Sequence, residues 1–295
     1  MTTIAFIGLG IMGAPMAENL VTAGFDVVGF NRSQPAMDRL VAAGGRSASS
    51  VADAVSDADI VATMLPDTPD VIAVFTGPDG VFSHARSGTL VVDFSTIKPE
   101  VSARLAAEGA AASLRILDAP VSGGEQGAID GTLSVMVGGS SDDFIAAAEL
   151  FRPVSATLVH VGPSGSGQIV KAANQLIVAG TLALLAEALV FLEAHGVNTD
   201  AAVRVLGGGL AGSTVLERKA AQMLSRDYTP GFRVELHHKD MGIVLDAART
   251  AGVATPLAAL SAQLLGSLVA RGDGSLDHSA LFGLVGELSG TTTSA

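Results

Sequence analysis

The most informative segment of the sequence is Ile4-Ala5-Phe6-Ile7-Gly8-Leu9-Gly10-Ile11-Met12-Gly13. An apolar run leads into glycines spaced G-x-G-x-x-G, and a helical pattern follows. Gly8 permits a tight turn, Gly10 lets the backbone approach a pyrophosphate, and Gly13 allows close contact between strand and helix. The amides and dipole of that helix would face the anion. The sequence therefore predicts a dinucleotide-binding turn formed by Gly8, Leu9, Gly10, Ile11, Met12 and Gly13.

Around this turn, short apolar runs alternate with helical stretches. Such alternation predicts parallel βαβ units, and runs that are apolar throughout predict a sheet covered on both faces. The predicted strands are Ile4–Ile7, Asp26–Phe30, Ile60–Leu65, Leu90–Asp93, Arg115–Asp118, Leu133–Val137 and Thr157–Val161. The predicted helices between them include Met12–Ala23, Ser50–Ser56, Pro99–Ala112 and Asp142–Phe151. We expect an α/β Rossmann-type dinucleotide-binding domain over residues 1–162.

After Gly162-Pro163-Ser164-Gly165 the strand signal ends. A long helix over about 167–195 and shorter ones near 199–206, 213–224, 234–250, 256–271 and 278–289 predict an all-α domain over residues 163–295. Its apolar stretch Leu176–Leu192 is interrupted by polar residues and falls short of the ~20 residues of a membrane span. A helix apolar on nearly every side is expected to be buried between domains or subunits. The tail Thr291–Ala295 is predicted to be disordered.

Composition excludes several classes of function. A net charge of −12 disfavours nucleic acid or an anionic membrane as the main partner. The absence of cysteine removes disulfides, thiolate nucleophiles and cysteine-bound metals, and fits a cytoplasmic protein. His237 and His238 are neighbours on a predicted helix and would point ~100° apart, so no metal site is predicted.

The end of the second predicted strand indicates the cofactor. An acid there would accept hydrogen bonds from a ribose 2′-hydroxyl, whereas an arginine favours a 2′-phosphate. This chain has Asn31-Arg32-Ser33 and no acid. Arg32 can offer a charge-assisted fork, and Asn31 and Ser33 can add donors. NADP(H) is therefore favoured, with NAD(H) as the alternative, unless these residues form an ordinary solvated loop.

Two segments are candidates for chemistry. Ser122-Gly123-Gly124 follows the fifth predicted strand and offers a hydroxyl and unhindered amides that suit a small carboxylate, although a plain glycine turn has the same pattern. Lys171 and Asn174 share one face of the long helix near an apolar region, with Gly167 leaving room for a ligand. Lys171 is the candidate acid catalyst; the alternative is a solvated surface lysine.

Several motifs in order resemble the β-hydroxyacid dehydrogenase family over almost the whole chain. They are the glycine turn with Asn19, Asp118–Gly124, Gly131-Thr132-Leu133 with Met136–Gly139, Gly167…Lys171-Ala172-Ala173-Asn174, and Lys239-Asp240. On its own, the last pair could be a charge pair on a solvated face. Motifs in the carboxyl-terminal half are similar to the family's tartronate semialdehyde reductase (2-hydroxy-3-oxopropionate reductase) branch: Gly208–Leu216, Pro230–Arg233 and Asp277–Leu281. Asn31-Arg32-Ser33 departs from the acid-containing segment of many relatives.

The resemblance implies an NAD(P)-dependent oxidoreductase that reduces tartronate semialdehyde to glycerate. It implies Lys171 as the catalytic general acid, with Asn174 beside it, and a substrate site completed by Ser122, Gly123 and Gly124. It further implies that Leu65, Pro66, Thr96 and Lys239 line the cofactor, and that the chain forms a homo-oligomer, a dimer or a tetramer.

Other functions share these parts. Within the family they are 3-hydroxyisobutyrate oxidation and the reduction of glyoxylate or succinic semialdehyde, so the partner is a small 2- or 3-hydroxy acid or aldehyde acid. Imine reductases generally lack the lysine. From another class, the chain could be a non-catalytic NADP(H)-binding interaction module; Lys171, Asn174 and Ser122 together argue against that.

Overall fold

A computed structural model describes residues 1–290, and the predicted disordered tail lies outside the described residues. The chain divides into two compact units, Met1–Lys171 and the part from Ala172 onward. The division falls inside the long helix, nine residues beyond the predicted domain boundary, because the first turn of this helix hydrogen-bonds to the sheet unit. We describe each unit by itself.

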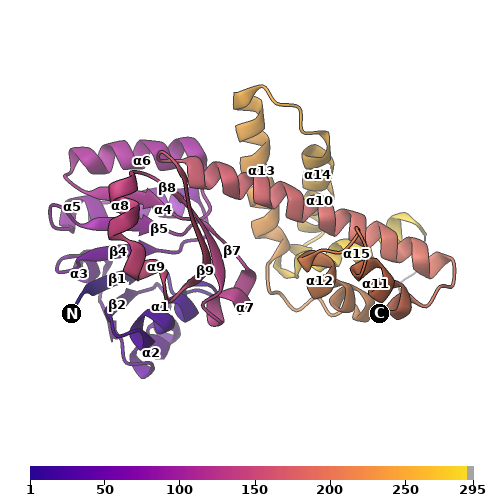
Figure 1. The fold of residues 1–295 in the computed structure, drawn as a ribbon, viewed down its shortest axis with the longest axis horizontal. Coiled ribbons are helices and arrows are strands. Elements are labelled where there is room, and N and C mark those ends of the chain that lie inside the picture. Colours follow the sequence, from indigo (N-terminus) through magenta and orange to yellow (C-terminus); the bar gives the residue numbers. More distant parts are fainter. Residues whose placement is uncertain (291–295) are drawn as a thin grey trace. The chain divides into compact units, whose positions relative to one another are not determined.

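The first unit contains one nine-stranded sheet in the order β3-β2-β1-β4-β5-β6-β8-β7, with β9 paired to β8 (Figure 1). Pairing is parallel from β3 to β6 and between β8 and β9, whereas β8 runs antiparallel to β6 and β7. The strands are β1 Thr3–Ile7, β2 Asp26–Phe30, β3 Arg46–Ser47, β4 Ile60–Thr63, β5 Leu90–Asp93, β6 Arg115–Asp118, β7 Val121–Ser122, β8 Leu133–Gly138 and β9 Ser155–Gly162.

Both faces of this sheet are buried. Phe6 of β1 packs in one core cluster with Phe94 and Phe151, while its neighbour Ala5 packs in a second cluster with Val61. Successive side chains on a strand point to opposite faces, so the two clusters confirm the predicted covering of both faces. The helices of this unit are α1 Gly13–Thr22, α2 Gln34–Ala42, α3 Val51–Val55, α4 Thr68–Thr76, α5 Val81–His84, α6 Pro99–Ala111, α7 Gly124–Ile129, α8 Ser141–Ala146 and α9 Ala148–Phe151.

The shortest strands and one helix break were not predicted from the sequence. The two-residue strands β3 and β7 are too short to show an alternation, and the helix predicted at 142–151 is split between α8 and α9 around Ala147. The antiparallel β8 also departs from the all-parallel expectation, because the chain between β6 and β8 turns back through β7 and α7.

The second unit is helical throughout its described residues. Its core is built from apolar side chains that include Leu182, Leu189, Met241, Leu265 and Phe282. The elements are α10 Ser166–Ala194, which begins in the first unit, α11 Thr199–Gly207, α12 Thr214–Ser225, α13 Val234–Ala251, α14 Pro256–Ala270, the 3₁₀ turns η1 Asp273–Ser275 and η2 His278–Ala280, and α15 Leu281–Leu288. The predicted all-α character is confirmed.

Helix α10 is longer than its apolar stretch suggested. Its 29 residues are long and apolar enough to cross a membrane by length and composition, so the expectation that this helix is too short is wrong. Leu182, Leu185 and Leu189 nevertheless lie buried in the helical core. A core helix passes the same test of length and composition.

Candidate functional site

The glycine turn has the close approaches that its pattern predicts. Gly8 has a φ of +98°, and a Cβ there would lie 2.3 Å from the carbonyl oxygen of Met64. At Gly13 a Cβ would lie 1.9 Å from the carbonyl oxygen of Gly8. Neither position tolerates a side chain, so both glycines are required by the fold itself.

Gly10 differs from its neighbours. A Cβ at Gly10 would meet no atom within 4 Å, and the residue is exposed. Nothing in the folded chain requires glycine here. An unhindered backbone beside the start of α1 is the cradle that a pyrophosphate needs, so the residues of this turn fit a dinucleotide.

The order of the strands places this turn at a topological switch point of the sheet. Strand β1 lies between β2 and β4, because the chain adds β2 and β3 on one side of β1 before it crosses to β4 on the other side. In open α/β sheets, ligands bind outside the carboxyl ends of the strands at such a point. The Gly8 amide donates to Phe30, and the Met64 amide donates to Ile7, which draws the three strand ends together.

The three residues after β2, Asn31, Arg32 and Ser33, differ in their contacts. The Asn31 side-chain oxygen accepts a hydrogen bond from the Leu9 amide at 3.1 Å, so it holds the glycine turn. The Arg32 side chain is 84% exposed, and its guanidinium lies 3.7 Å from Asp70. Ser33 precedes α2 and makes no capping bond with its side chain. The guanidinium of Arg32 is therefore accessible to an anionic ligand.

Leu65, Pro66 and Thr96 lie on the loops that follow β4 and β5. The Leu65 amide donates to the Ser95 hydroxyl oxygen at 2.9 Å, which ties the two loops together. Pro66 is exposed, whereas Thr96 is half-buried. Thus the structure brings three of the residues predicted to line the cofactor to neighbouring strand ends in the first unit.

Two buried acids, to which the sequence analysis assigns no role, lie at the strand ends that carry these loops. Asp93 and Asp118 are paired in register at the carboxyl ends of β5 and β6. Burial raises the pKa of Asp93 to about 6, although hydrogen bonds from Ser95 and Thr63 oppose the shift. Burial also raises the pKa of Asp118, against backbone hydrogen bonds that include the Gly165 amide. An acid that closes an apolar strand was the available sequence signal.

Lys171 is buried and points at the loop that carries the predicted carboxylate site. Its Nζ donates a hydrogen bond to the carbonyl oxygen of Val121 at 2.7 Å. Ser122, Gly123 and Gly124 follow directly, with φ values of +141° at Gly123 and +65° at Gly124. The solvated-lysine alternative is therefore wrong, and the lysine and the Ser-Gly-Gly run are neighbours.

Gly167 does not leave room for a ligand as the sequence suggested. A Cβ there would lie 2.3 Å from the Met136 carbonyl oxygen and 2.7 Å from an Asp118 carboxylate oxygen. The space beside Gly167 is filled by the sheet, so this glycine lets α10 pack against β6 and β8.

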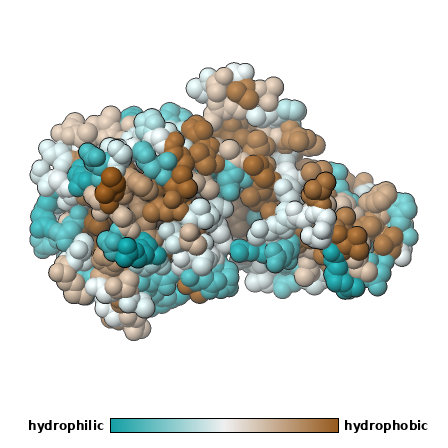
Figure 2. Space-filling view, viewed as in Figure 1, coloured by the Kyte–Doolittle hydropathy of each residue, from teal (hydrophilic) through white to brown (hydrophobic). Residues whose placement is uncertain are grey.

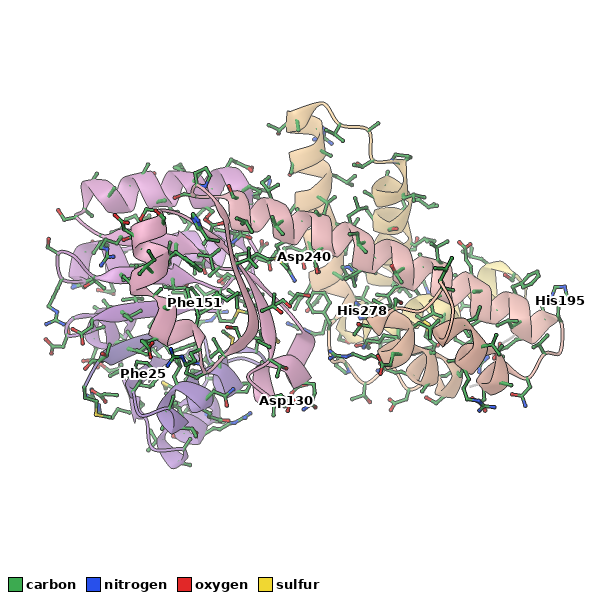
Figure 3. The ribbon with its side chains drawn as sticks, in the orientation of Figure 1. Phe25, Asp130, Phe151, His195, Asp240 and His278 are labelled. Atoms are coloured by element: carbon green, nitrogen blue, oxygen red, sulfur yellow. The ribbon has the colours of Figure 1, made fainter. Side chains whose placement is uncertain are left out.

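In the second unit, Asn174 and Lys239 belong to one hydrogen-bonded chain. Asn174 donates its side-chain amide to Gln175 at 2.8 Å, and Gln175 donates to Asp240 at 2.6 Å. Lys239 pairs with the same buried carboxylate at 2.8 Å. Asp240 is labelled on α13 in Figure 3. The charge pair is therefore not on a solvated face.

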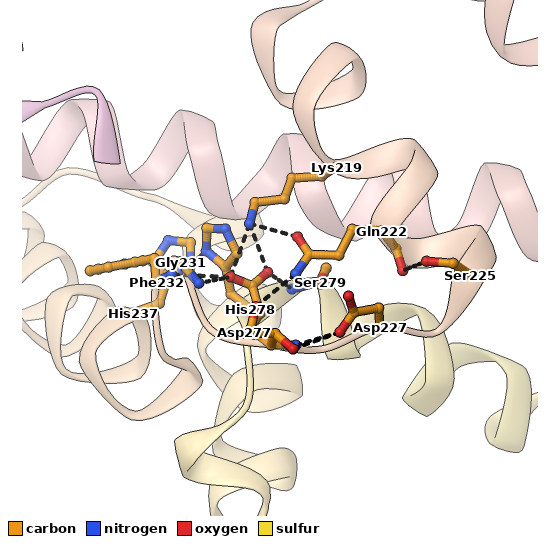
Figure 4. A network of polar contacts seen from close by, with 11 residues as sticks. Lys219, Gln222, Ser225, Asp227, Gly231, Phe232, His237, Asp277, His278 and Ser279 are labelled. Carbon is orange, nitrogen blue, oxygen red and sulfur yellow. Dashed lines mark hydrogen bonds and ion pairs between the residues drawn. The ribbon is translucent and has the colours of Figure 1, made fainter. Parts of the chain in front are cut away.

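The helical unit contains a second buried polar network (Figure 4). Asp277 has no exposed surface, and both its oxygens accept hydrogen bonds from Lys219 at 2.8 and 2.9 Å. The His237 and His278 Nδ1 atoms lie 3.0 Å apart. Burial, with His237 beside it, holds the pKa of His278 well below its usual range.

Neither network forms a metal site. In residues 1–290 no group of three or more His, Cys, Asp or Glu side chains is arranged to hold a metal ion.

Comparison with known proteins identifies the family. A family described as the NAD binding domain of 6-phosphogluconate dehydrogenase matches residues 3–162. Residues 165–285 match a family described as NAD-binding of NADP-dependent 3-hydroxyisobutyrate dehydrogenase.

Individual relatives match over nearly their whole length. The 2-hydroxy-3-oxopropionate reductase of Escherichia coli (strain K12) is 38% identical over 278 residues, which cover 94% of this chain and 95% of the relative. The NAD-dependent L-serine dehydrogenase of Pseudomonas aeruginosa is 38% identical over 288 residues, with 95% and 97% coverage. The solved structure of Mycobacterium tuberculosis 3-hydroxyisobutyrate dehydrogenase with L-serine has a TM-score of 0.88, 34% identity, and 97% and 99% coverage.

These matches agree with the Rossmann-type unit, the helical unit and the glycine turn. The chain belongs to the β-hydroxyacid dehydrogenase family of NAD(P)-binding oxidoreductases.

Proposed function

We propose that this protein reduces tartronate semialdehyde (2-hydroxy-3-oxopropanoate) to glycerate with NADPH. The observation that carries the proposal is the buried Lys171 ammonium beside the Ser122-Gly123-Gly124 turn. The 38% identical relative named 2-hydroxy-3-oxopropionate reductase supports the choice of substrate.

Lys171 acts as the general acid. When bound, the nicotinamide supplies a hydride to the aldehyde carbon. The Lys171 ammonium stabilises the negative charge that develops on the carbonyl oxygen and donates a proton to it, which completes the alcohol. Asn174 follows one helical turn later on α10 and orients the lysine or that oxygen.

Ser122, Gly123 and Gly124 anchor the substrate carboxylate. Ser122 is partly exposed and ends β7, and a Cβ at Gly124 would meet no atom within 4 Å. The hydroxyl and backbone amides are therefore suited to hold an anion. Fixing the carboxylate also fixes the aldehyde against the hydride donor, which is the positional part of catalysis.

Arg32 determines the preference for NADPH over NADH. Its exposed guanidinium follows β2, and the segment Asn31-Arg32-Ser33 contains no acid that would accept a hydrogen bond from a ribose 2′-hydroxyl. The cofactor role of Lys239 stays a prediction, as does a cytoplasmic location.

The test is a substrate panel. Purified protein is assayed with NADPH and NADH against tartronate semialdehyde, glyoxylate and succinic semialdehyde, and for oxidation of 3-hydroxyisobutyrate and L-serine. We expect the highest kcat/KM for tartronate semialdehyde. A higher value for another acid would reassign the substrate, and a protein that binds NADPH but turns over none of them would favour the non-catalytic module.

We also propose a homo-oligomer. Ile177, Leu184 and Phe191 recur every seven residues on α10 and are 68%, 64% and 63% exposed. Hydrophobic surface follows α10 in Figure 2. An exposed stripe of large apolar side chains is typical of an interface between subunits. Sedimentation of Leu184→Glu should show dissociation, with Ile145→Glu, 69% exposed at Ile145 on α8, as the matched control.

A further inference from the structure

Gln168 connects α10 to the loop that follows β5. Its side-chain nitrogen donates to the Ser95 carbonyl oxygen at 2.8 Å, and its side-chain oxygen accepts from the Ile97 amide at 3.1 Å. The two bonds straddle Thr96. We propose that Gln168 is a positioning residue for the reductase reaction, which holds Thr96 at a fixed position relative to Lys171.

Gln168 is itself held firmly in the first unit. Gln168 is 1% exposed, and its own backbone amide donates to the Asp118 carboxylate at 3.1 Å. The Gly165 amide donates to the other oxygen of Asp118 at 2.7 Å. Since Gly167 packs directly against the Met136 carbonyl, the first turn of α10 has little freedom to move. The Gln168 side chain therefore fixes the loop after β5 relative to β6, which carries Asp118.

The loop is held on its other side as well. Ser95 donates its backbone amide to Asp93 at 3.0 Å, and its hydroxyl accepts from Leu65. Gln168 adds two further bonds to this loop, one on each side of Thr96. Lys171 lies three residues further along the same helix, about one turn away. The two hydrogen bonds from the Gln168 side chain, to Ser95 and Ile97, are called the clamp below. The clamp links the loop that is proposed to line the cofactor to the helix that carries the proposed proton donor.

The carboxamide of Gln168 satisfies both partners at every pH, because it does not titrate. The Ser95 carbonyl needs a donor and the Ile97 amide needs an acceptor, and both are buried. A neutral carboxylic acid can do the same, with O–H as donor and C=O as acceptor. A carboxylate keeps the acceptor but sets a negative oxygen against the Ser95 carbonyl. Methionine has a similar volume and makes neither bond.

This inference rests on the proposed function, and three variants test it. Gln168→Met removes the clamp, and Gln168→Glu makes it depend on pH. Thr89→Val is the control because it removes another buried hydrogen bond of the same unit, Thr89 to Ala58, at the opposite end of β5.

We expect Gln168→Met to lower kcat by about tenfold or more while the Kd for NADPH, measured by fluorescence, changes by less than about threefold. Loss of alignment without loss of cofactor binding separates positioning from general destabilisation. Thr89→Val should keep the wild-type kcat. A wild-type kcat in Gln168→Met, or an equal loss in Thr89→Val, overturns the proposal.

The glutamate variant gives a signature in the pH profile. Burial favours the neutral acid, so Gln168→Glu should approach wild-type kcat at low pH and lose it as pH rises through the raised pKa of the new carboxyl group. Wild type lacks this additional limb. Identical profiles for Gln168→Glu and wild type contradict the clamp.

A readout without turnover separates this inference from the proposed substrate. Hydrogen exchange of the Ile97 amide should be faster in Gln168→Met than in wild type and unchanged in Thr89→Val. Equal exchange in all three proteins overturns the clamp. Faster exchange in a protein inactive toward every aldehyde acid preserves the clamp and removes only the proposed reaction.

Discussion

Lys171 donates a hydrogen bond from Nζ to the carbonyl oxygen of Val121 across 2.7 Å. The two residues are 50 positions apart, and the contact brings a buried ammonium to the residue that precedes Ser122. A cation and a candidate carboxylate site are thereby neighbours within a single unit. An acid catalyst needs this arrangement, because the proton must be delivered to a substrate that is already anchored.

Lys171 should be required for turnover but not for cofactor binding. Lys171→Ala removes the proton donor and its charge, so kcat should fall by a factor on the order of 10² or more. The Kd for NADPH should stay near wild type, because the glycine turn is intact. Single-turnover and fluorescence measurements check both values. Near wild-type kcat would remove the lysine from the mechanism.

The glycines of the turn should separate stability from cofactor binding. Gly10→Ala meets no atom in the folded chain, so its melting temperature should stay near that of wild type while NADPH binding weakens. Gly13→Ala brings a Cβ against the Gly8 carbonyl oxygen and should destabilise the unit by about 1–3 kcal/mol. Thermal unfolding and NADPH titration distinguish them; equal behaviour of the two variants would contradict the assignment of Gly10.

Arg32 should control the choice of cofactor. Its guanidinium offers a charge-assisted fork to a 2′-phosphate, so Arg32→Ser should lower kcat/KM for NADPH by about tenfold and leave NADH nearly unaffected. Steady-state kinetics with both cofactors provide the check. A wild-type preference for NADH of about tenfold or more would reverse the prediction.

Asp93 should make stability depend on pH. Its pKa rises from 3.8 to about 6 on folding, chiefly because of burial, so the folded state holds a proton that the unfolded state has lost. The free energy of unfolding therefore decreases, from this group, as pH rises from about 4 to about 6. Asp93→Asn should lack this decrease.

Urea unfolding at pH 4, 5, 6 and 7 measures the difference between wild type and Asp93→Asn, in which the contributions of groups that do not interact with Asp93 cancel. The difference should favour the variant increasingly up to about pH 6 and then level off. A difference that is constant with pH would show that Asp93 does not titrate in this range.

Lys219 should be required by the helical unit. Burial would raise the pKa of Asp277, but hydrogen bonds from Lys219 and from backbone amides outweigh it and hold that pKa below its usual value. Since His278 is neutral at neutral pH, Lys219 supplies the opposing charge there. Lys219→Met should cost about 3–5 kcal/mol by leaving a buried carboxylate unpaired. Adding Asp277→Asn should recover part of that loss in denaturant titrations; purely additive losses would show that the pair is uncoupled.

The order of the main elements and the dinucleotide turn could be predicted from local sequence patterns alone. The apolar runs Ile4–Ile7 and Leu90–Asp93 are confirmed as buried strands within one or two residues, and the long helix lies where it was expected. These features depend on residues that are neighbours in sequence. Alternation, glycine spacing and helix breakers therefore suffice to predict them.

The contacts of several side chains, by contrast, became evident only from the folded structure. Gly167 accommodates the Met136 carbonyl where the sequence predicts room for a ligand, and Asn31 holds the Leu9 amide, a partner that the sequence does not predict. Gln168 reaches Ser95 across 73 residues, and Lys171 reaches Val121 across 50. Such partners depend on how β5 and β6 are placed in the sheet, and no local pattern encodes that placement. The glycine turn is a local property of the chain, whereas the surroundings of Lys171 are created by sheet order and register.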